Sequence, residues 1–361
     1  MLRHGFKFYG QTVKLATFEP GNNLNPTVWD LYKKNRLTVV RQVRYDPNND
    51  NELDLVLFLN GLPIVTCELK NAITGQKVGH AKKQYREDRD PKAPIFRWRD
   101  GAKRALVHFA VDTDEAWMST RLAGLSTWFL PFNKGDGHGK GNPAVEDKHR
   151  THYLWEEVWE RSSLLDLVGR FIHLQTEKGV NPNTGKTWEK KTLIFPRYHQ
   201  RDCVRRLVAG ARAKGAGTNY LVQHSAGSGK SNSIAWLAHR LASLHDADDQ
   251  KVYDAVVVLT DRRVLDQQLQ ETIHQFEHKT GVVEKIDKHS DQLAEALQGG
   301  VPIIISTIHK FGFIQDKIES LPDRRYAIIV DEAHSSQSGE MAVKVKELLS
   351  DSSLEAKLKA D

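Results

Sequence analysis

From about Leu193 onward, short apolar runs alternate with segments whose apolar residues recur at helical spacing. This alternation constrains the fold more than any other feature of the chain. Continuous valine and isoleucine runs suit parallel strands covered on both faces, and strands that alternate with helices indicate a parallel α/β sheet. We therefore predict four such strands, at Asn219–Gln223, Ala255–Leu259, Pro302–Ser306 and Tyr326–Val330.

A glycine-rich loop, HSAGSGKS at His224–Ser231, follows the first of these runs. Gly227 and Gly229 allow a tight turn that aims backbone N–H groups at phosphate oxygens. Lys230 can reach the β- and γ-phosphates of a nucleotide, and the Ser231 hydroxyl can ligate Mg²⁺. The order of strand, loop and helix therefore predicts a phosphate-binding loop.

The helix expected after this loop has one apolar stripe, formed by Ile234, Leu237, Leu241 and Leu244. Its N-terminus would add a positive dipole end to the loop. The general phosphate-loop pattern has glycine where this chain has His224, although the Gly-Lys-Ser end is intact. The alternative is a glycine- and serine-rich loop with an incidental lysine.

An acidic pair, Asp331-Glu332, ends the fourth apolar run. Asp331 can hold Mg²⁺, and Glu332 can orient and deprotonate an attacking water. An acid after a strand can also be a helix N-terminal residue favoured by the helix dipole. Its pairing with an upstream phosphate loop favours the nucleotide site.

The stretch LDLVLFLNGLPIVTCELKN, residues 53–71, predicts a β-hairpin around Asn60-Gly61. It carries Asp54 in its first arm and Glu68 and Lys70 at the end of the second. Glu68 and Lys70 are two apart, so they share one face of a strand.

The hairpin register decides whether the acids meet. A two-residue loop at Asn60-Gly61 sets Asp54 opposite Cys67, with Glu68 on the other face. A one-residue shift exchanges the two faces. A metal site at Asp54 and Glu68 therefore requires a three-residue turn or a bulge.

Asp-Glu-Ala-His at 331–334 resembles motif II of superfamily 2 helicases and translocases. The segment Phe195–Gln200 resembles the adenine-reading element of that family, with Gln200 as the base contact. LTDRRVLDQQ at 259–268 resembles motif Ia, and ISTIHKF at 305–311 resembles the segment before motif II, although a plain strand cap explains STIHKF equally well. The resemblance implies ATP and Mg²⁺ bound by the following residues: Gln200, Gly227, Ser228, Gly229, Lys230, Ser231 and Asp331.

Asp54 followed by Glu68-x-Lys70 resembles the PD-(D/E)xK nuclease core. The resemblance implies that Asp54 and Glu68 hold Mg²⁺ and that Lys70 activates water or neutralises charge on the scissile phosphate. Related nucleases often have a Gln-x-x-x-Tyr element. This chain has Gln84 but Asp88 at the tyrosine position. The alternative is an amphipathic edge hairpin whose charges are solvated.

Four phrases, DLVLFLNGLPIVTCELKN, FLPFNKG, YLWEEVW and LLDLVGRFIHL, resemble the restriction (R) subunit of type I restriction–modification enzymes. The resemblance runs from about residue 18 to residue 339. It implies an ATP-driven translocase that cleaves double-stranded DNA away from its recognition site, together with modification and specificity subunits. The chain stops at Asp361, soon after motif II, without a second RecA-like lobe. We therefore expect this chain alone to bind ATP weakly and not to translocate.

The 361 residues exceed one ordinary domain. We predict a mixed α/β endonuclease-like domain at 1–178, a linker at 179–192 and a RecA-like ATP-binding lobe at 193–361. Within the first domain we expect a helix at 79–90, two strands in 105–122, a long loop at 131–150 and one or two helices in 153–174. Two distant cysteines, no apolar window of about 18 residues and no signal-peptide layout predict a cytoplasmic protein.

Three other functions fit parts of the sequence. The first is a standalone superfamily 2 helicase with a non-catalytic N-terminal domain. The second is a type III-like ATP-dependent nuclease, in which the domain order usually differs. The third is an inactive fragment that serves as an assembly module. The net charge of +6 permits polyanion binding without distinguishing among these functions.

Overall fold

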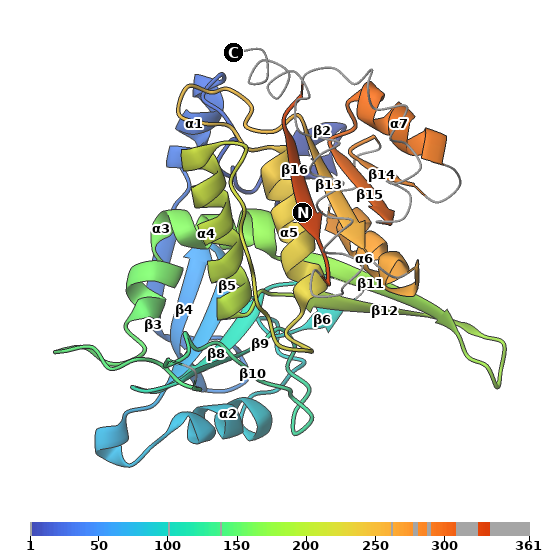
Figure 1. Cartoon of the computed structure of the whole chain (residues 1–361). Helices are drawn as coiled ribbons and strands as arrows, with labels where there is room; N and C mark the ends of the chain where they lie inside the picture. The colour runs from blue at the N-terminus through green and yellow to red at the C-terminus, as the bar shows by residue number, and fades with distance from the viewer. Residues whose placement is uncertain are drawn as a thin grey trace. The chain divides into compact units, whose positions relative to one another are not determined.

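The computed structural model of the chain (Figure 1) describes residues 2–99, 102–137, 139–260, 263–276, 281–286, 290–307 and 324–332. The chain divides into two compact units, Met1–Arg201 and Asp202–Asp361. Each is an α/β unit, the first built on a mixed sheet and the second on a parallel sheet. The predicted fold class is therefore confirmed.

The first unit is built on a six-stranded sheet with the strand order β10-β9-β8-β5-β4-β3. Strands β5 and β8 are parallel, and all other neighbours in the sheet are antiparallel. The strands are β3 (Leu37–Arg44), β4 (Glu52–Leu59), β5 (Leu62–Leu69), β8 (Val107–Val111), β9 (Ala116–Ser119) and β10 (Leu130–Pro131).

The β4–β5 hairpin combines a tight turn with a bulge. Asn60 and Gly61 have φ of 51° and 82°, as a two-residue type I′ turn requires. Phe58 pairs with Pro63 but Leu57 pairs with Val65, so Ile64 is an extra residue in β5. The predicted hairpin is confirmed, and it contains the bulge that a metal site at its two acids requires.

Helix α2 (Val78–Glu87) covers one face of this sheet (Figure 1). Its buried residues Val78, Ala81 and Tyr85 join the hydrophobic core with Val56 and Phe96. The Asp112 carboxylate accepts a hydrogen bond from the Val78 N–H at 2.7 Å, which satisfies a backbone donor at the start of the helix. The predicted helix is therefore confirmed, and it lies over the face that carries Thr66 and Glu68.

The opposite face is covered by the helical region 153–171. It contains two π-helical turns, Leu154–Val158 and Leu167–Phe171, with α3 (Arg161–Asp166) between them. Phe109 of β8 makes edge-to-face contacts at 5.3 Å with both Phe132 and Trp159. The sheet therefore lies between two helical layers. Its polar side chains Asp54 and Glu68 lie near the start of β4 and near the end of β5.

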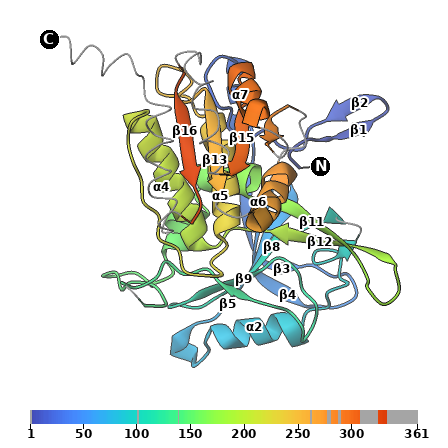
Figure 2. The same cartoon turned by 45° about the vertical axis from the view of Figure 1, so that its right-hand side comes forward.

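The remaining elements of the first unit are small, apart from a long hairpin, β11–β12. Residues 179–192, predicted as a linker, lie within this hairpin, which Figure 2 shows outside the six-stranded sheet. Its strands pair over eight residues each, so backbone pairing overrides the polar, turn-rich composition. These elements are β1 (Phe6–Phe8), β2 (Gln11–Val13), α1 (Pro26–Lys33), a 3₁₀ turn (Ala72–Thr74), β6 (Trp98–Arg99), β7 (Ala102–Lys103), β11 (His173–Val180) and β12 (Thr187–Ile194).

The second unit contains a parallel four-stranded sheet with the order β14-β15-β13-β16. Three of the four predicted strands are confirmed. Its strands are β13 (Ala255–Thr260), β14 (Val283–Lys285), β15 (Ile303–Thr307) and β16 (Tyr326–Val330). Its helices are α4 (Tyr198–Lys214), which begins in the first unit, α5 (Lys230–Ala242), α6 (Arg263–Phe276) and α7 (Ser290–Gly299).

The remaining predicted strand, the first in the chain at 219–223, is wrong. This segment has no strand structure, and the Leu221 side chain is 91% exposed. An apolar run becomes a strand only when a neighbour supplies hydrogen-bond partners, and none of the described strands pairs with this segment.

The helix after the phosphate loop is present, but its buried stripe differs from the prediction. Leu241 and Leu244 are buried as expected. Trp236 is also fully buried, and Ile234 and Leu237 are only half-buried. The stripe is therefore rotated around the helix, because the large indole ring takes the core position.

Candidate functional site

Two clusters of predicted site residues occur in the structure, one in each unit. In the first unit the bulged register pairs Leu55 with Cys67, so the next positions outward, Asp54 and Glu68, lie opposite one another. The Asp54 carboxylate accepts a hydrogen bond from the Leu69 N–H at 2.7 Å. Lys70 follows β5, half-buried, and makes no ion pair with any described residue. The hairpin therefore brings Asp54, Glu68 and Lys70 together.

The Glu68 side chain is fully buried. Burial raises the pKa of Glu68 to about 8, the Arg89 guanidinium opposes this shift, and the Asp54 carboxyl adds to it. Its Oε1 accepts hydrogen bonds from Arg89, whereas the buried Oε2 has no hydrogen-bond partner among the described residues. A buried acceptor without a partner is costly, and here it lies beside a second carboxylate.

This arrangement fits a divalent cation. A cation between the two carboxylates would satisfy Glu68 Oε2 and relieve the repulsion between Asp54 and Glu68. Among the described residues there is no group of three or more His, Cys, Asp or Glu side chains that could hold a metal. Mg²⁺ is commonly held by only one or two carboxylates with waters and substrate phosphates, so a pair is sufficient for that ion.

The second cluster surrounds the phosphate loop. Gly227 has φ of 71°, and Gly229, the N-cap of α5, has φ of 84°. Glycine adopts this left-handed conformation without steric cost. Ser228 is buried, and α5 begins at Lys230, so the first N–H groups of the helix face the end of the loop.

Lys230 and Glu332 are brought together in the second unit. The Lys230 ammonium lies 2.5 Å from Glu332 Oε1, and this hydrogen bond raises the pKa of Lys230. The Asp331 N–H donates to the Leu259 carbonyl at 2.9 Å, which joins β16 to β13. The phosphate loop and the acidic pair, about a hundred residues apart in sequence, therefore form one polar cluster.

The two other predicted superfamily 2 segments are only partly visible. Thr260 ends β13, and Thr307 ends β15. Residues 261–262 and 308–311 lie outside the described residues, whereas residues 263–268 of the first segment begin α6. The His334 position of the motif also lies outside them. The resemblance of these segments to the superfamily 2 motifs therefore stays a prediction.

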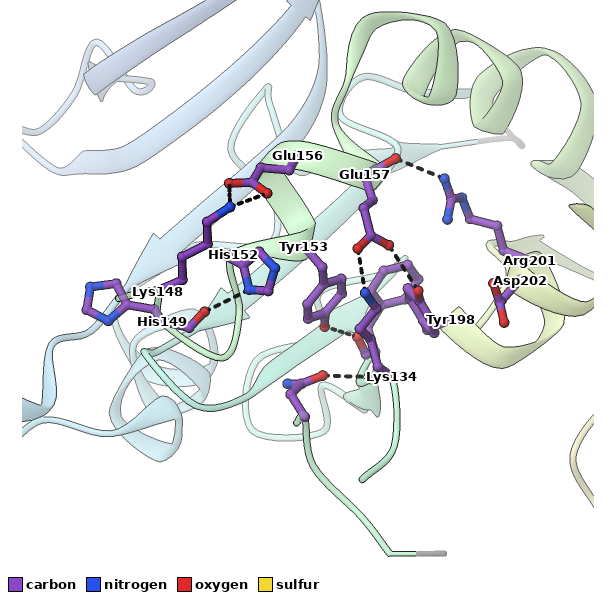
Figure 3. Close-up of polar contacts among 12 residues, drawn as sticks. Lys134, Lys148, His149, His152, Tyr153, Glu156, Glu157, Tyr198, Arg201 and Asp202 are labelled. Carbon is purple, nitrogen blue, oxygen red and sulfur yellow. Dashed lines mark hydrogen bonds and ion pairs between the residues drawn. The ribbon is translucent and has the colours of Figure 1, made fainter. Parts of the chain in front are cut away.

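The first turn of α4 is held by a polar and aromatic cluster of the first unit (Figure 3). Glu157 Oε1 lies 2.5 Å from the Lys134 ammonium, and Glu157 Oε2 accepts from the Tyr198 hydroxyl at 3.2 Å. Arg201 donates to the Glu157 carbonyl at 3.0 Å. Gln200, in the same turn, is buried, and its Oε1 accepts from the Arg197 N–H at 2.9 Å. The predicted adenine contact therefore has a local role in starting the helix, and its contact to a base stays a prediction.

A cavity of about 360 Å³ adjoins the segment after Lys70. Its basic side chains are already engaged: Lys148 pairs with Glu156 at 2.7 Å, as Figure 3 shows, and Arg150 lies 3.7 Å from Asp114. In the first unit, the candidate catalytic residues are therefore Asp54 and Glu68 and not the residues that line this cavity. The cavity is lined by Asn71, Ala72, Ile73, Thr113, Asp114, Ala144, Val145, Lys148, His149 and Arg150.

Two protein families match the chain, one over each candidate site. The family described as type I restriction enzyme R protein N terminus matches residues 1–127, and the SWI2/SNF2 ATPase family matches residues 199–356. The chain is thus similar to a type I restriction enzyme R protein N terminus over residues 1–127 and to a SWI2/SNF2 ATPase over residues 199–356. The first matched region contains Asp54, Glu68 and Lys70, and the second contains the phosphate loop and Asp331-Glu332.

Curated relatives agree with both matches. The HindI endonuclease subunit of Haemophilus influenzae is 26% identical over 348 residues, which are 91% of this chain and 29% of the relative. The type I restriction enzyme SsaAORF53P endonuclease subunit of Staphylococcus saprophyticus is 24% identical over 321 residues, 85% of this chain and 30% of the relative. The chain spans about 30% of the length of the curated relatives it matches. The predicted resemblance is confirmed.

No described helix of the chain is both long enough and apolar enough to cross a membrane.

The sequence did not point to several buried polar residues of the first unit. Arg89 contacts Glu68, although the charged run around it gave no sign of this. The Thr66 hydroxyl lies 2.9 Å from the Tyr85 hydroxyl and 2.8 Å from His108 Nδ1, so a polar network continues along the same face. Gln84 lies on α2 with a buried Oε1 that has no partner, and Asp88 is the exposed C-cap of that helix.

Proposed function

We propose that the chain is the nuclease and first ATPase portion of a type I restriction subunit, which couples ATP-driven DNA translocation to Mg²⁺-dependent cleavage of unmodified DNA. The observation that supports it best is the bulged register of β4 and β5, which sets Asp54 opposite Glu68. A solvated edge hairpin, the alternative interpretation, does not account for a carboxylate that is fully buried beside a second one.

In the nuclease centre, Asp54 and Glu68 would hold Mg²⁺. When bound, this ion stabilises negative charge on the scissile phosphate and lowers the pKa of water. Lys70 directly follows β5, two residues after Glu68. Its ammonium can neutralise the charge that develops on the phosphate and can position the attacking water. The Leu69 N–H fixes the Asp54 carboxylate, so the acid needs little reorganisation on binding.

In the ATPase centre, the loop glycines and Ser228 would surround the phosphates of ATP. Lys230 would exchange Glu332 for the β- and γ-phosphates, which releases Glu332 to orient and deprotonate the attacking water. Asp331 and Ser231 would hold the Mg²⁺ that accompanies the nucleotide, and Gln200 would contact the adenine.

The partners follow from the family. The curated relatives are endonuclease subunits of type I restriction enzymes, and we propose double-stranded DNA, a modification subunit and a specificity subunit as partners of this chain. Contacts to DNA phosphates, which carry no sequence information, suit a subunit that moves along DNA. We also propose a cytoplasmic location.

The test is nicking of supercoiled plasmid by the purified chain in Mg²⁺, compared with the Asp54→Ala and Lys70→Ala variants. We expect nicking by the wild-type chain and at least a hundredfold loss in both variants, since each removes a group that acts on the reacting phosphate. Lys83→Ala is the matched control, because this lysine lies on the exposed side of α2 and pairs only with Glu87 at 3.6 Å. Equal nicking by the wild-type chain and Asp54→Ala would contradict the proposal.

A further inference from the structure

We propose that Arg89 is a positioning residue of the nuclease centre, which holds the Glu68 carboxylate by one oxygen so that its other oxygen is presented to the divalent cation. This inference rests on the proposed function of Asp54 and Glu68 as ligands of a divalent cation. It assigns a role to a residue that lies outside the Asp, Glu and Lys of the hairpin.

The contacts between Arg89 and Glu68 are one-sided. The Arg89 Nε and Nη2 atoms both lie 2.7 Å from Glu68 Oε1. Glu68 Oε2 is buried and accepts no hydrogen bond from any residue that the structure describes. A bidentate arginine–carboxylate pair would normally use both oxygens. Here the guanidinium leaves one oxygen unoccupied, on the carboxylate that faces Asp54.

Arg89 is itself fixed in place. Its Nη2 also donates to the Glu52 carbonyl at the start of β4, at 2.7 Å, and its guanidinium carbon lies 5.6 Å from the centre of the Tyr45 ring. The Arg89 side chain is only 4% exposed. A guanidinium tied to a strand carbonyl and an aromatic ring does not move aside on cation binding. It therefore acts as a support for Glu68 and not as a competitor for the cation position.

Arg89 also compensates the buried charge. Glu68 must be ionised to bind a cation, and an isolated carboxylate at a fully buried position is strongly disfavoured. The guanidinium stabilises the ionised form through Oε1 without using the ligand oxygen. Partners of metal ligands typically contribute roughly 10- to 100-fold to metal affinity.

The experiment is a titration of the full 361-residue chain with Mn²⁺ in the absence of nucleotide, followed by electron paramagnetic resonance of the free ion. We compare the wild-type chain with Arg89→Met, which keeps the bulk of the side chain, and Arg89→Lys, which keeps the charge. We expect Mn²⁺ to bind roughly 10- to 100-fold more weakly to Arg89→Met. Arg89→Lys should be intermediate, because one ammonium cannot replace the planar fork that holds both Glu68 and Glu52.

Arg161→Met is the matched control for loosening of the fold. Arg161 also donates to backbone carbonyls, those of Tyr32, Lys33 and Asn35, and lies 5.5 Å from an aromatic ring centre, but it supports α1. Its Mn²⁺ affinity should equal that of the wild-type chain. Circular dichroism of each variant checks that it folds. If Arg89→Met does not fold, the Mn²⁺ affinity of Arg89→Lys is compared with that of the wild-type chain instead.

The Asp54→Asn variant distinguishes failure of the proposed metal site from failure of the proposed role of Arg89. If this variant loses Mn²⁺ binding but the folded Arg89 variants keep the wild-type affinity, the role of Arg89 is overturned and the metal site stands. Tighter binding by Arg89→Met would show that Arg89 competes with the cation, and it would overturn the inference as well. If Asp54→Asn binds Mn²⁺ like the wild-type chain, the proposed nuclease centre fails and the inference fails with it.

Discussion

At the residue scale, Glu68 makes stability depend on pH. Burial raises its pKa to about 8, above the value of an unfolded chain. The folded state therefore keeps a proton that the unfolded state loses, so the stability it contributes is complete below the unfolded pKa and is lost as pH rises toward 8. In metal-free buffer, we expect the free energy of unfolding of Glu68→Gln to rise relative to the wild type between pH 5 and 8, by at most about 1.4 kcal/mol per pH unit.

Urea denaturation at four pH values in this window measures the effect. Glu87→Gln is the matched control, because Glu87 lies on the exposed side of α2 and its replacement should give a curve parallel to that of the wild type. A Glu68→Gln curve that is also parallel would show that Glu68 is not buried as a protonated acid.

A second residue-scale prediction concerns the ion pair between Lys230 and Glu332. Nucleotide binding must separate this pair, because Lys230 would move to the phosphates. Since both side chains are partly exposed, the pair stabilises the nucleotide-free state by at most about 1 kcal/mol. We therefore expect Glu332→Gln to bind ADP up to about fivefold more tightly and Lys230→Ala to lose most binding, both by calorimetric titration. Weaker binding by Glu332→Gln would contradict a competition between Glu332 and phosphate.

At the element scale, the β4–β5 turn depends more on a side chain than on backbone freedom. Asn60 Oδ1 accepts from the Arg36 N–H at 2.7 Å, and its Nδ2 donates to the Leu15 carbonyl at 2.8 Å. A Cβ at Gly61 would meet no atom within 4 Å, so only its φ of 82° disfavours alanine. We expect Gly61→Ala to cost about 1 kcal/mol and Asn60→Ala roughly 2–3 kcal/mol, since it also loses three side-chain hydrogen bonds, the third of them to Asn35 Oδ1 at 3.1 Å.

The denaturant midpoints of the two variants show whether Asn60→Ala is more destabilising than Gly61→Ala. Gly75→Ala is a matched control, because Gly75 has φ of 73° and a Cβ there would likewise meet no atom within 4 Å. Its cost should resemble that of Gly61→Ala. If Gly61→Ala were more damaging than Asn60→Ala, the turn would be limited by backbone strain and not by the contacts of Asn60.

The sequence predicted the helices and strands better than it predicted which strands and side chains contact one another. Asn-Gly between apolar runs predicted the hairpin, but not that Ile64 would be the bulged residue, because packing and not local propensity decides where a ladder slips. Apolarity at 219–223 predicted a strand that has no pairing neighbour among the described strands. The charged run at 82–90 offered several cations, and only the folded structure shows that Arg89, just beyond the end of α2, contacts Glu68.

At the scale of the whole molecule, the two candidate sites belong to separate compact units, so each ligand should stabilise only its own unit. A ligand at 100 times its dissociation constant adds about 2.7 kcal/mol to the unit that binds it, which corresponds to roughly 5 °C or more for a unit of this size. In scanning calorimetry we expect Mn²⁺ to raise one unfolding transition and ADP, in chelated buffer, to raise the other. Asp54→Asn should abolish only the Mn²⁺ shift and Lys230→Ala only the ADP shift. Loss of both shifts in either single variant would show that the two sites fold and bind as one cooperative unit, in which case the nuclease centre and the ATPase centre could not be assigned to independent domains.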